Sequence, residues 1–300
     1  MLLTYRPLLK TPSGLEYLLL AQGTMLSVQG EGAAAGRVRQ AYASAAFMQR
    51  ADPDSAFAPL SLSQKGGLCS ALFSGQGGGL LREFLKRAPP AAQYAAGRRA
   101  GRALRALHSL PLEEAELKLA EKHQAGFMEK LASYLGSMPH FRRDQVSLDA
   151  LSERYDHFKC WKKVRRYGQL RDDRILVRAD STVALLPSAS CAPGDACEDF
   201  ALLECQCAGL YPLCCAGIID GYFQGAIPPA FWVSFALQSA FYSLWRLGRM
   251  AQSSRRAFVI MQSEHERVCA DFEDFKKPVP SWYRAESVKK ARQAANAKGL

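Results

Sequence analysis

Residues 167–177, YGQLRDDRILV, carry the side chains whose types and spacing come nearest to a catalytic loop. Two adjacent acids, Asp172 and Asp173, precede a short apolar stretch that is typical of a strand. Carboxylates in such a loop could orient a nucleophile or hold a divalent cation, because both tasks require negatively charged oxygen. Arg171 and Arg174 lie on either side of the acids, which favours the simpler interpretation of a solvated turn with balanced charges.

Two glycine-rich segments have the composition of phosphate-binding loops. Residues 30–36, GEGAAAG, follow a predicted strand and open a predicted helix, but the third glycine is wrongly spaced for a dinucleotide fingerprint and no βαβ pattern follows. Residues 75–79, GQGGG, lie where strand patterns give way to helical ones. We therefore interpret both segments as connections, the second being a hinge in which glycine permits a tight chain path.

The nine cysteines give no indication of a metal site. Their number is odd, no C-x-x-C pair occurs, and the first residues, MLLTYRPLLK, lack the apolar core of a signal peptide. We expect a reducing, cytoplasmic environment in which most of these thiols are small buried hydrophobic groups. Zinc is not expected, because the cysteine spacings are not finger-like and the five histidines are scattered.

The elements that must hold the loop change in character along the chain. Strands are predicted at residues 16–21, 24–29, 57–63 and 68–74, a helix at 37–50, and, within a later region of helical periodicity, a hairpin with strands at 175–177 and 183–186. Hydrophobic residues make up 48% of the 300 residues and charged residues 22%, which is enough apolar material for a sizeable core.

This order predicts an α+β protein with a bilobal, protein-kinase-like layout. A β-rich lobe with one helix is expected over residues 1–78 and a mainly helical lobe over 79–300, which includes the loop and hairpin at 167–187; together they form one domain. The longest nearly uncharged run, residues 226–245, contains prolines and serines that favour a buried helix beginning near Pro228 over a membrane span. We expect no membrane partner.

Several motifs resemble the aminoglycoside phosphotransferase and choline-kinase-like family. Residues 101–111, GRALRALHSLP, are similar to a family helix that ends in Leu-His, and residues 185–206 are similar to its metal-binding hairpin and the Gly-Asp-Pro that follows. Residues 216–232 and 278–283 resemble a bacterial branch of the family. The resemblance covers roughly residues 15–283, and it implies a kinase-like fold that uses ATP and magnesium to phosphorylate a hydroxyl group.

At the catalytic loop, the resemblance assigns the family's positions to residues of different chemistry. Tyr167 stands in place of the histidine of the family's His-Gly-Asp, Gly168 is retained, and Gln169 stands in place of the catalytic aspartate. Arg174 occupies the position of the metal-binding asparagine. Phosphoryl transfer depends on positioning and electrostatics, and a glutamine cannot accept the proton of the attacking hydroxyl as a carboxylate does.

Two further positions are changed outside the loop. The resemblance places Pro187 at the second metal ligand, an aspartate, and Ser27 at the basic residue that holds the nucleotide phosphates. Proline has no side-chain oxygen for a hard cation, an arginine at position 174 adds a positive charge where magnesium is required, and serine gives a phosphate no countercharge. If each defect costs about 10²-fold, two of them already remove most of a useful rate.

The sequence therefore predicts a catalytically inactive pseudokinase that acts as a binding or regulatory module for an unknown small ligand or a protein partner, with no cofactor expected. Its cleft could still hold a small ligand or a nucleotide without metal. The alternative is an active ATP- and magnesium-dependent small-molecule kinase in which Asp172 and Asp173 substitute for the missing acids. His108 and Asp195 are predicted to be structural, the latter as a helix cap.

A second alternative rests on charge. The formal net charge is +11, which disfavours polycationic aminoglycosides as substrates. Residues 159–166, KCWKKVRR, place five cations around Trp161 and are predicted to form a solvated amphipathic helix. Read functionally, residues 159–178 would be an anion- or nucleic-acid-binding surface. Nucleic acid is not favoured as a partner, because no recognised binding motif is present.

Overall fold

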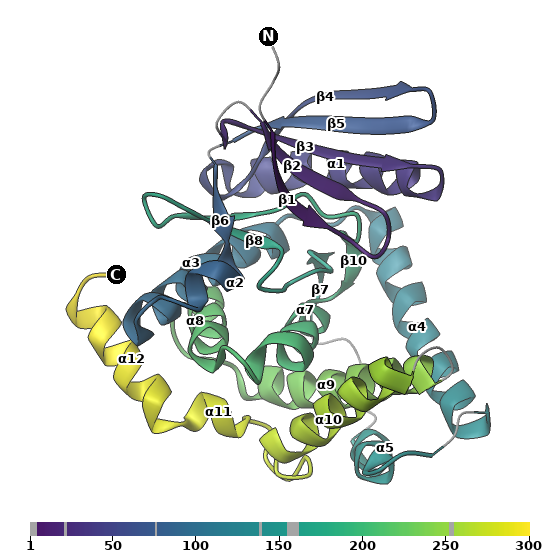
Figure 1. The fold of residues 1–300 in the computed structure, drawn as a ribbon. Helices are drawn as coiled ribbons and strands as arrows, with labels where there is room; N and C mark the ends of the chain where they lie inside the picture. Colours follow the sequence, from purple (N-terminus) through teal and green to yellow (C-terminus); the bar gives the residue numbers. More distant parts are fainter. Residues whose placement is uncertain (1–4, 21–22, 76, 138–139, 155–161, 252–254) are drawn as a thin grey trace.

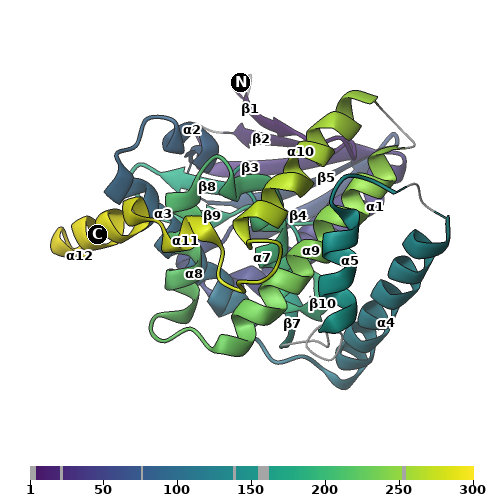
Figure 2. The ribbon, with the colours of Figure 1, turned by 90° about the horizontal axis from the view of Figure 1, so that it is seen from below.

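The computed structural model describes residues 5–20, 23–75, 77–137, 140–154, 162–251 and 255–300. Within them the chain forms a small lobe built on one sheet and a larger, mainly helical lobe (Figure 1). Seen from below, α4 and α5 lie at one end of the helical lobe and α12 at the other (Figure 2). The predicted α+β organisation is confirmed.

The small lobe is a five-stranded antiparallel sheet in the order β1-β2-β3-β5-β4, covered on one face by helix α1. Its elements are β1 (Tyr5–Lys10), β2 (Glu16–Leu20), β3 (Met25–Glu31), α1 (Ala33–Ala51), a short 3-10 turn (Pro53–Ser55), β4 (Ala58–Lys65) and β5 (Leu68–Ser74). Leu26 and Val28 of β3 share one hydrophobic cluster with Val38 and Ala45 of α1. This cluster forms the core of the lobe.

Strand β1 was not predicted. It lies at the sheet edge, mostly exposed, and Pro7 interrupts its pattern next to an irregularity in the pairing with β2. A proline is tolerated in a strand at such an edge, because the missing N–H has no inner partner. The connection from β3 to α1 turns at Gly32, which has a positive φ of 54°.

The larger lobe contains helices and two small sheets. The helices are α2 (Leu81–Leu85), α3 (Pro90–His108), α4 (Glu114–Ser137), α5 (Asp144–Glu153), α7 (Ala196–Leu203), which continues into a π-helical turn η3 (Glu204–Ala208), α8 (Pro212–Phe223), α9 (Pro229–Ala251), α10 (Arg255–Asp271), α11 (Ser281–Arg284) and α12 (Glu286–Ala297). The strands are β6 (Gly78–Leu80), β7 (Lys163–Arg166), β8 (Ile175–Arg178), β9 (Val183–Leu185) and β10 (Ala192–Asp195).

The predicted hairpin is present as β8 and β9, and β6 joins it as a third antiparallel strand. The predicted division between the lobes, after residue 78, therefore falls within β6, a strand that pairs with the larger lobe. The uncharged run lies in α9, which begins at Pro229 and buries Phe231 and Phe235 completely. No helix among the described residues is long and apolar enough to cross a membrane.

The helix predicted for residues 159–166 is wrong where the structure describes it. Residues 163–166 form β7, which pairs antiparallel with β10, while residues 159–161 lie outside the described part. The run of cations indicated a solvated helix face, but the backbone hydrogen bonds to β10 decide the conformation. Local sequence carries no information about that partner strand, which follows almost thirty positions later.

Helices α3 and α8 approach so closely that both require glycine at the crossing. A methyl group on Gly97 or Gly101 of α3 would lie 2.1 Å or 2.0 Å from the carbonyl oxygen of Cys214 or Ile218 of α8. Gly217 and Gly221 of α8 are equally close to α3, at 2.1 Å and 2.0 Å from main-chain oxygens. The two helices therefore pack backbone against backbone, with no room for any side chain at these positions.

We expect Gly101→Ala to lower the free energy of unfolding by about 1–2 kcal/mol, measured by urea denaturation. Alanine favours a helix by about 1 kcal/mol over glycine, but overpacking typically costs about 1–3 kcal/mol, and here the obstacle is backbone, which cannot rotate away. Gly126→Ala in α4 is the control, because a methyl group there meets no atom within 4 Å. It should stabilise by about 0.5–1 kcal/mol. Equal stabilisation by both variants would contradict this packing.

Candidate functional site

The first residues of the candidate loop are held by one buried carboxylate on α7. The backbone N–H groups of Tyr167 and Gly168 donate to the two oxygens of Asp199, at 2.8 Å and 2.7 Å. His108, at the end of α3, places Nε2 3.1 Å from Asp199 Oδ2 and Nδ1 3.2 Å from the hydroxyl of Tyr222. His108 is therefore structural, as predicted, and fixes the loop through Asp199.

Asp195 also has its predicted role. It is the N-cap of α7, and its side chain accepts a hydrogen bond from Cys197 N at 2.8 Å. Glu198 completes a capping box by accepting from Asp195 N at 2.9 Å. The acids just after the hairpin thus stabilise the start of the helix that carries Asp199.

Gly168 is explained by backbone geometry alone. Its φ is 74°, and a methyl group there would lie 2.3 Å from the carbonyl oxygen of Ser190. The next residue, Gln169, donates from Nε2 to Ser190 Oγ at 3.2 Å. Retention of this glycine does not require that the loop be catalytic, because no other residue would fit the turn.

Arg174 is buried between the lobes, with only 3% of its surface exposed. Its guanidinium lies 5.7 Å from the ring centroid of Tyr17, which belongs to β2 of the small lobe. The carboxylate of Asp173 is its ion-pair partner, at a long 3.7 Å from Nε. Nε and Nη1 are buried without a hydrogen-bond partner among the described residues. A positive charge therefore occupies the position that the resemblance assigns to a metal ligand.

Pro187 contributes a backbone oxygen to a contact between the lobes. Its carbonyl accepts a hydrogen bond of 2.9 Å from the hydroxyl of Tyr17. Burial raises the pKa of Tyr17 to about 12, although the nearby Arg174 opposes this, so the phenol remains a neutral donor. A second bond across the lobes joins Ser188 N to Ser44 Oγ of α1 at 3.0 Å. The segment after β9 thus binds both β2 and α1.

Tyr167 holds the loop to the hairpin. The hydroxyl of Tyr167 lies 2.9 Å from the carbonyl oxygens of both Arg174 and Leu186, and the side chain is completely buried. Burial raises the pKa of this phenol well above its ordinary value, so it too is neutral. Tyr167 therefore closes the loop on itself through hydrogen bonds to main-chain oxygen.

The two acids of the loop differ in how firmly their carboxylates are held. Asp173 forms a bidentate pair with Arg171, at 2.9 Å and 2.5 Å. The carboxylate of Asp172 faces η3, where the Sγ of Cys207 lies 3.9 Å away, and its carbonyl accepts from Arg82 N of α2. Burial raises the pKa of Asp172, with a smaller contribution from the neighbouring Asp173. The solvated turn predicted for this pair is partly buried instead.

Ser27 is not brought together with the loop. Side chains alternate between the faces of a strand, and Leu26 and Val28 on either side of Ser27 point into the core beneath α1. Ser27 lies on the opposite face, where its Oγ is 3.1 Å from Gln29 Nε2 and 3.4 Å from Ser70 Oγ. The hydrophobic alternation along residues 25–29 predicts that Ser27 lies on the face opposite the core. The match to the family motif nevertheless assigned Ser27 to the phosphate-binding position.

Tyr17 and Ser44 are the residues of the site that sequence reasoning missed. The Tyr17–Pro187 bond spans 170 positions and the Ser44–Ser188 bond spans 144. Nothing local distinguishes this tyrosine or this serine from others in the chain. Their contacts become visible only when the lobes are placed together.

Magnesium does not fit the donor groups present at these positions. Magnesium requires oxygen ligands, whereas Arg174 presents a guanidinium, the Pro187 carbonyl already accepts from Tyr17, and Asp173 is paired with Arg171. Across the described part of the chain, no three or more His, Cys, Asp or Glu side chains are grouped to hold a metal ion.

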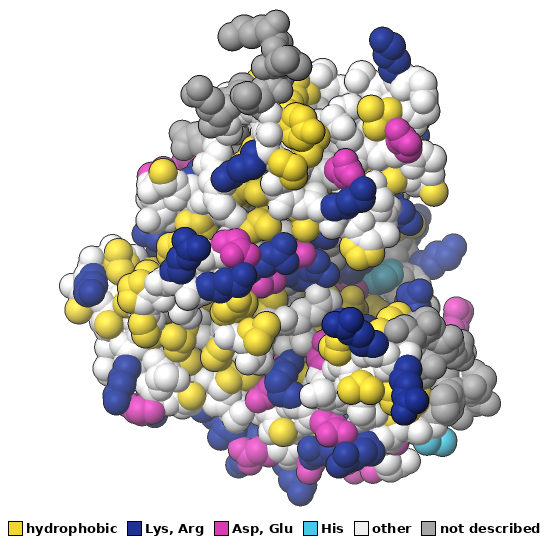
Figure 3. All heavy atoms as spheres, in the orientation of Figure 1, with side chains coloured by type: hydrophobic (Ala, Val, Ile, Leu, Met, Phe, Trp, Pro, Cys, Tyr) yellow, Lys and Arg dark blue, Asp and Glu magenta, His cyan; other side chains and the backbone are white. Residues whose placement is uncertain are grey.

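The basic segment before the loop is largely neutralised by acids. Lys163, Arg165 and Arg166 form ion pairs with Glu121, Glu116 and Glu198 at 2.6, 2.5 and 2.7 Å, respectively. Arg165 is also buried, with its guanidinium 3.7 Å from the ring centroid of Phe47. On the face shown in Figure 3, Lys and Arg side chains are interspersed with Asp and Glu. These contacts leave little uncompensated charge on β7 for a polyanion.

Solved structures with the same fold include several kinases. A choline/ethanolamine kinase family protein from Mesorhizobium loti is 12% identical, with 98% of this chain and 92% of that chain covered at a TM-score of 0.64. An ethanolamine kinase from Plasmodium vivax is 12% identical, with 89% of this chain and 82% of that chain covered at a TM-score of 0.56. An aminoglycoside phosphotransferase from Streptomyces rimosus is 15% identical, with 80% of this chain and 92% of that chain covered at a TM-score of 0.51.

No match is found among curated protein sequences. At the level of protein families, residues 17–203 match the model described as the phosphotransferase enzyme family. That range includes β2, α1, α3, the candidate loop and the hairpin. Together with the kinase-like fold, this match shows that the chain belongs to the phosphotransferase enzyme family, as the sequence motifs predicted.

Proposed function

We propose that this protein is a catalytically inactive member of the family, a pseudokinase that acts as a binding or regulatory module. The observation that carries the proposal is the buried guanidinium of Arg174, which packs against Tyr17 at the position expected to bind metal. Gln169, which replaces the catalytic aspartate, has no charge, so the loop supplies neither a base nor a metal ligand at the two positions that matter most.

The electrostatics of a guanidinium at position 174 support the proposal. At an effective dielectric constant of about 20, two like unit charges about 4 Å apart repel by roughly 4 kcal/mol, and a divalent ion doubles that figure. A metal next to Arg174 would need additional carboxylates to offset the repulsion, but Asp173 is already held by Arg171. Arg174 thus places a positive charge where magnesium binding needs oxygen ligands.

The contacts across the lobes support the same function. Tyr17 binds the Pro187 carbonyl, and Ser44 binds the backbone of Ser188, so the segment at the second metal position now joins the lobes. A kinase must admit a nucleotide between its lobes and release it after each turnover. Direct hydrogen bonds between the lobes at this point favour a fixed arrangement over such a cycle.

The positions of the loop acids do not favour an active kinase with relocated acids. Asp173 has both oxygens bonded to Arg171, and Asp172 faces η3. Asp173 is therefore not available to orient a hydroxyl unless its pair with Arg171 breaks. The ion pairs of β7 similarly give no specific support to an anion-binding surface there.

We expect no magnesium-dependent rise in melting temperature when the purified protein is titrated with ATP. A ligand at about 100 times its Kd stabilises the folded state by about 2.7 kcal/mol, so binding would be readily detected. In parallel, ADP release should not exceed the protein-free background. A magnesium-dependent shift, or multiple turnovers that Asp172→Asn or Asp173→Asn abolishes, would overturn the proposal and restore the active-kinase alternative.

The contact between the lobes predicts that Tyr17→Phe lowers the free energy of unfolding by about 1–3 kcal/mol. The substitution removes the hydroxyl and leaves the buried Pro187 carbonyl without its partner, while the volume of the ring is kept. Tyr5→Phe is the matched control, because Tyr5 is 65% exposed and should change stability by less than about 0.5 kcal/mol. Urea denaturation measures both. If the two variants behave alike, the Tyr17 bond does not hold the lobes together.

A further inference from the structure

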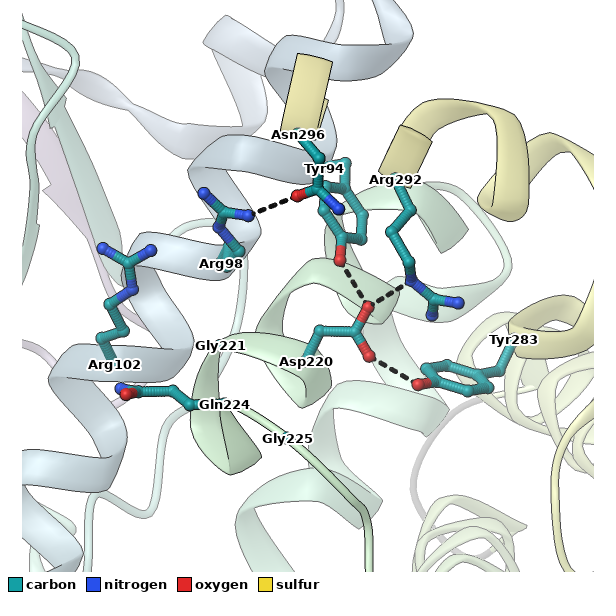
Figure 4. Close-up of a pocket in the computed structure, with 10 residues that line it drawn as sticks. All are labelled: Tyr94, Arg98, Arg102, Asp220, Gly221, Gln224, Gly225, Tyr283, Arg292 and Asn296. Carbon is teal, nitrogen blue, oxygen red and sulfur yellow. Dashed lines mark hydrogen bonds and ion pairs between the residues drawn. The ribbon is translucent and has the colours of Figure 1, made fainter. Parts of the chain in front are cut away.

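A second polar cavity lies in the helical lobe, and none of its lining residues belongs to the interlobe site. It has a volume of about 600 Å³, and its walls come from α3, α8, α12 and the segment around α11 (Figure 4). Arg98 and Arg102 extend from α3 on one side and Arg292 from α12 on the other, with Asp220 of α8 between them. Its volume is within the range of small-molecule sites.

The one acidic side chain that lines this cavity is already saturated with donors. Asp220 Oδ2 accepts from the Tyr94 hydroxyl at 2.5 Å and from Arg292 Nε at 2.7 Å, while Oδ1 accepts from the Tyr283 hydroxyl at 2.5 Å. Burial and the bond to Asp220 raise the pKa of Tyr94 to about 12, and the same causes raise that of Tyr283. Both phenols therefore remain neutral donors and do not add negative charge.

The arginines leave an excess of positive charge. Arg98 and Arg102 are four positions apart on α3, a spacing at which like charges destabilise a helix. Arg102 forms no hydrogen bond or ion pair with any part of the chain that the structure describes. Burial, together with the charges of Arg98 and Arg99, lowers the pKa of Arg102. Arg102 is exposed, and no described carboxylate pairs with its guanidinium.

The other two arginines are only partly satisfied. Arg98 donates from Nη1 to the neutral side chain of Asn296 at 2.8 Å and from Nη2 to a main-chain oxygen of Leu300. Arg292 uses Nε for Asp220, but its Nη2 is buried without a partner among the described residues. A buried guanidinium nitrogen without an acceptor is costly, and an anion in the cavity would supply that acceptor.

We propose that this cavity binds the phosphate group of a small phosphorylated metabolite. Three arginines and one saturated carboxylate line the cavity, so its lining carries an excess of positive charge, which matches an anionic phosphate group. Guanidinium groups bind phosphate oxygens through paired N–H donors, and the neutral phenols Tyr94 and Tyr283 add polarity without repulsion. The cavity is larger than one phosphate ion, which leaves room for the organic part of the ligand. The proposal does not depend on loss of phosphotransfer.

The test is calorimetric titration with inorganic phosphate and pyrophosphate, with potassium chloride of equal ionic strength as the reference. Saturable binding is expected, and Arg102→Gln should weaken it at least about tenfold, because Arg102 has no other partner to occupy it. Arg99→Gln is the matched control, since Arg99 lies on the same helix but does not line the cavity. Unliganded melting temperatures of both variants should equal that of the parent, so weaker binding cannot be ascribed to unfolding.

Three results would overturn the proposal: no saturable binding of either probe at millimolar concentration, equal weakening by Arg99→Gln and Arg102→Gln, or binding of citrate without binding of phosphate. The last result would indicate that the cavity binds carboxylate ligands. ATP also carries phosphate, and the two sites remain distinguishable. A rise in melting temperature with ATP that needs no magnesium and disappears in Arg102→Gln would indicate binding to this cavity. A magnesium-dependent rise that persists in Arg102→Gln would indicate binding to the interlobe site.

Discussion

The carboxylate of Asp199 fixes the geometry on which the rest of the loop depends. It accepts from the backbone N–H groups of Tyr167 and Gly168 and contacts His108 at the end of α3. Hydrogen bonds to a charged group contribute about 1.5–3 kcal/mol each, so this anchor is among the stronger local interactions of the lobe. Because the loop uses backbone donors, the anchor holds whether position 167 carries a histidine or a tyrosine.

The residues Tyr167, Arg174, Tyr17 and Pro187 are connected to one another as well as to the fold. The Tyr167 hydroxyl binds the backbone of Arg174, the Arg174 guanidinium packs on Tyr17, and Tyr17 binds the backbone at Pro187. A change at one position alters the environment of the next, so substitutions here are not expected to act additively. Gln169→Asp alone would leave the buried guanidinium and the bond between the lobes in place.

Periodicity in the sequence was enough to predict the lobes, helix α1 and the β8–β9 hairpin, because each is determined by apolar spacing within one segment. Periodicity did not predict β7, because its run of cations is typical of a solvated helix face although the strand is paired with β10. Motif matching assigned Ser27 to the phosphate-binding position, but its hydroxyl contacts Gln29 and Ser70 on the face of the sheet opposite the core. The Tyr17–Pro187 bond could not be predicted, because no local pattern encodes a contact between residues so far apart. Periodicity within a segment therefore predicted most helices and strands, whereas the site depends on tertiary contacts between segments that are far apart in the sequence.

Helix α3 shows how one packing constraint can shape two sites. Gly97 and Gly101 allow α8 to approach until the backbones touch, and this approach places Arg98 and Arg102 beside Asp220. At the far end of the same helix, His108 contacts Asp199 and so holds the loop. A side chain larger than hydrogen at either glycine would force the helices apart and disturb the cavity wall, and it would also shift the residue that anchors the loop. The close crossing of α3 and α8 is thus a requirement of the cavity and of the loop together.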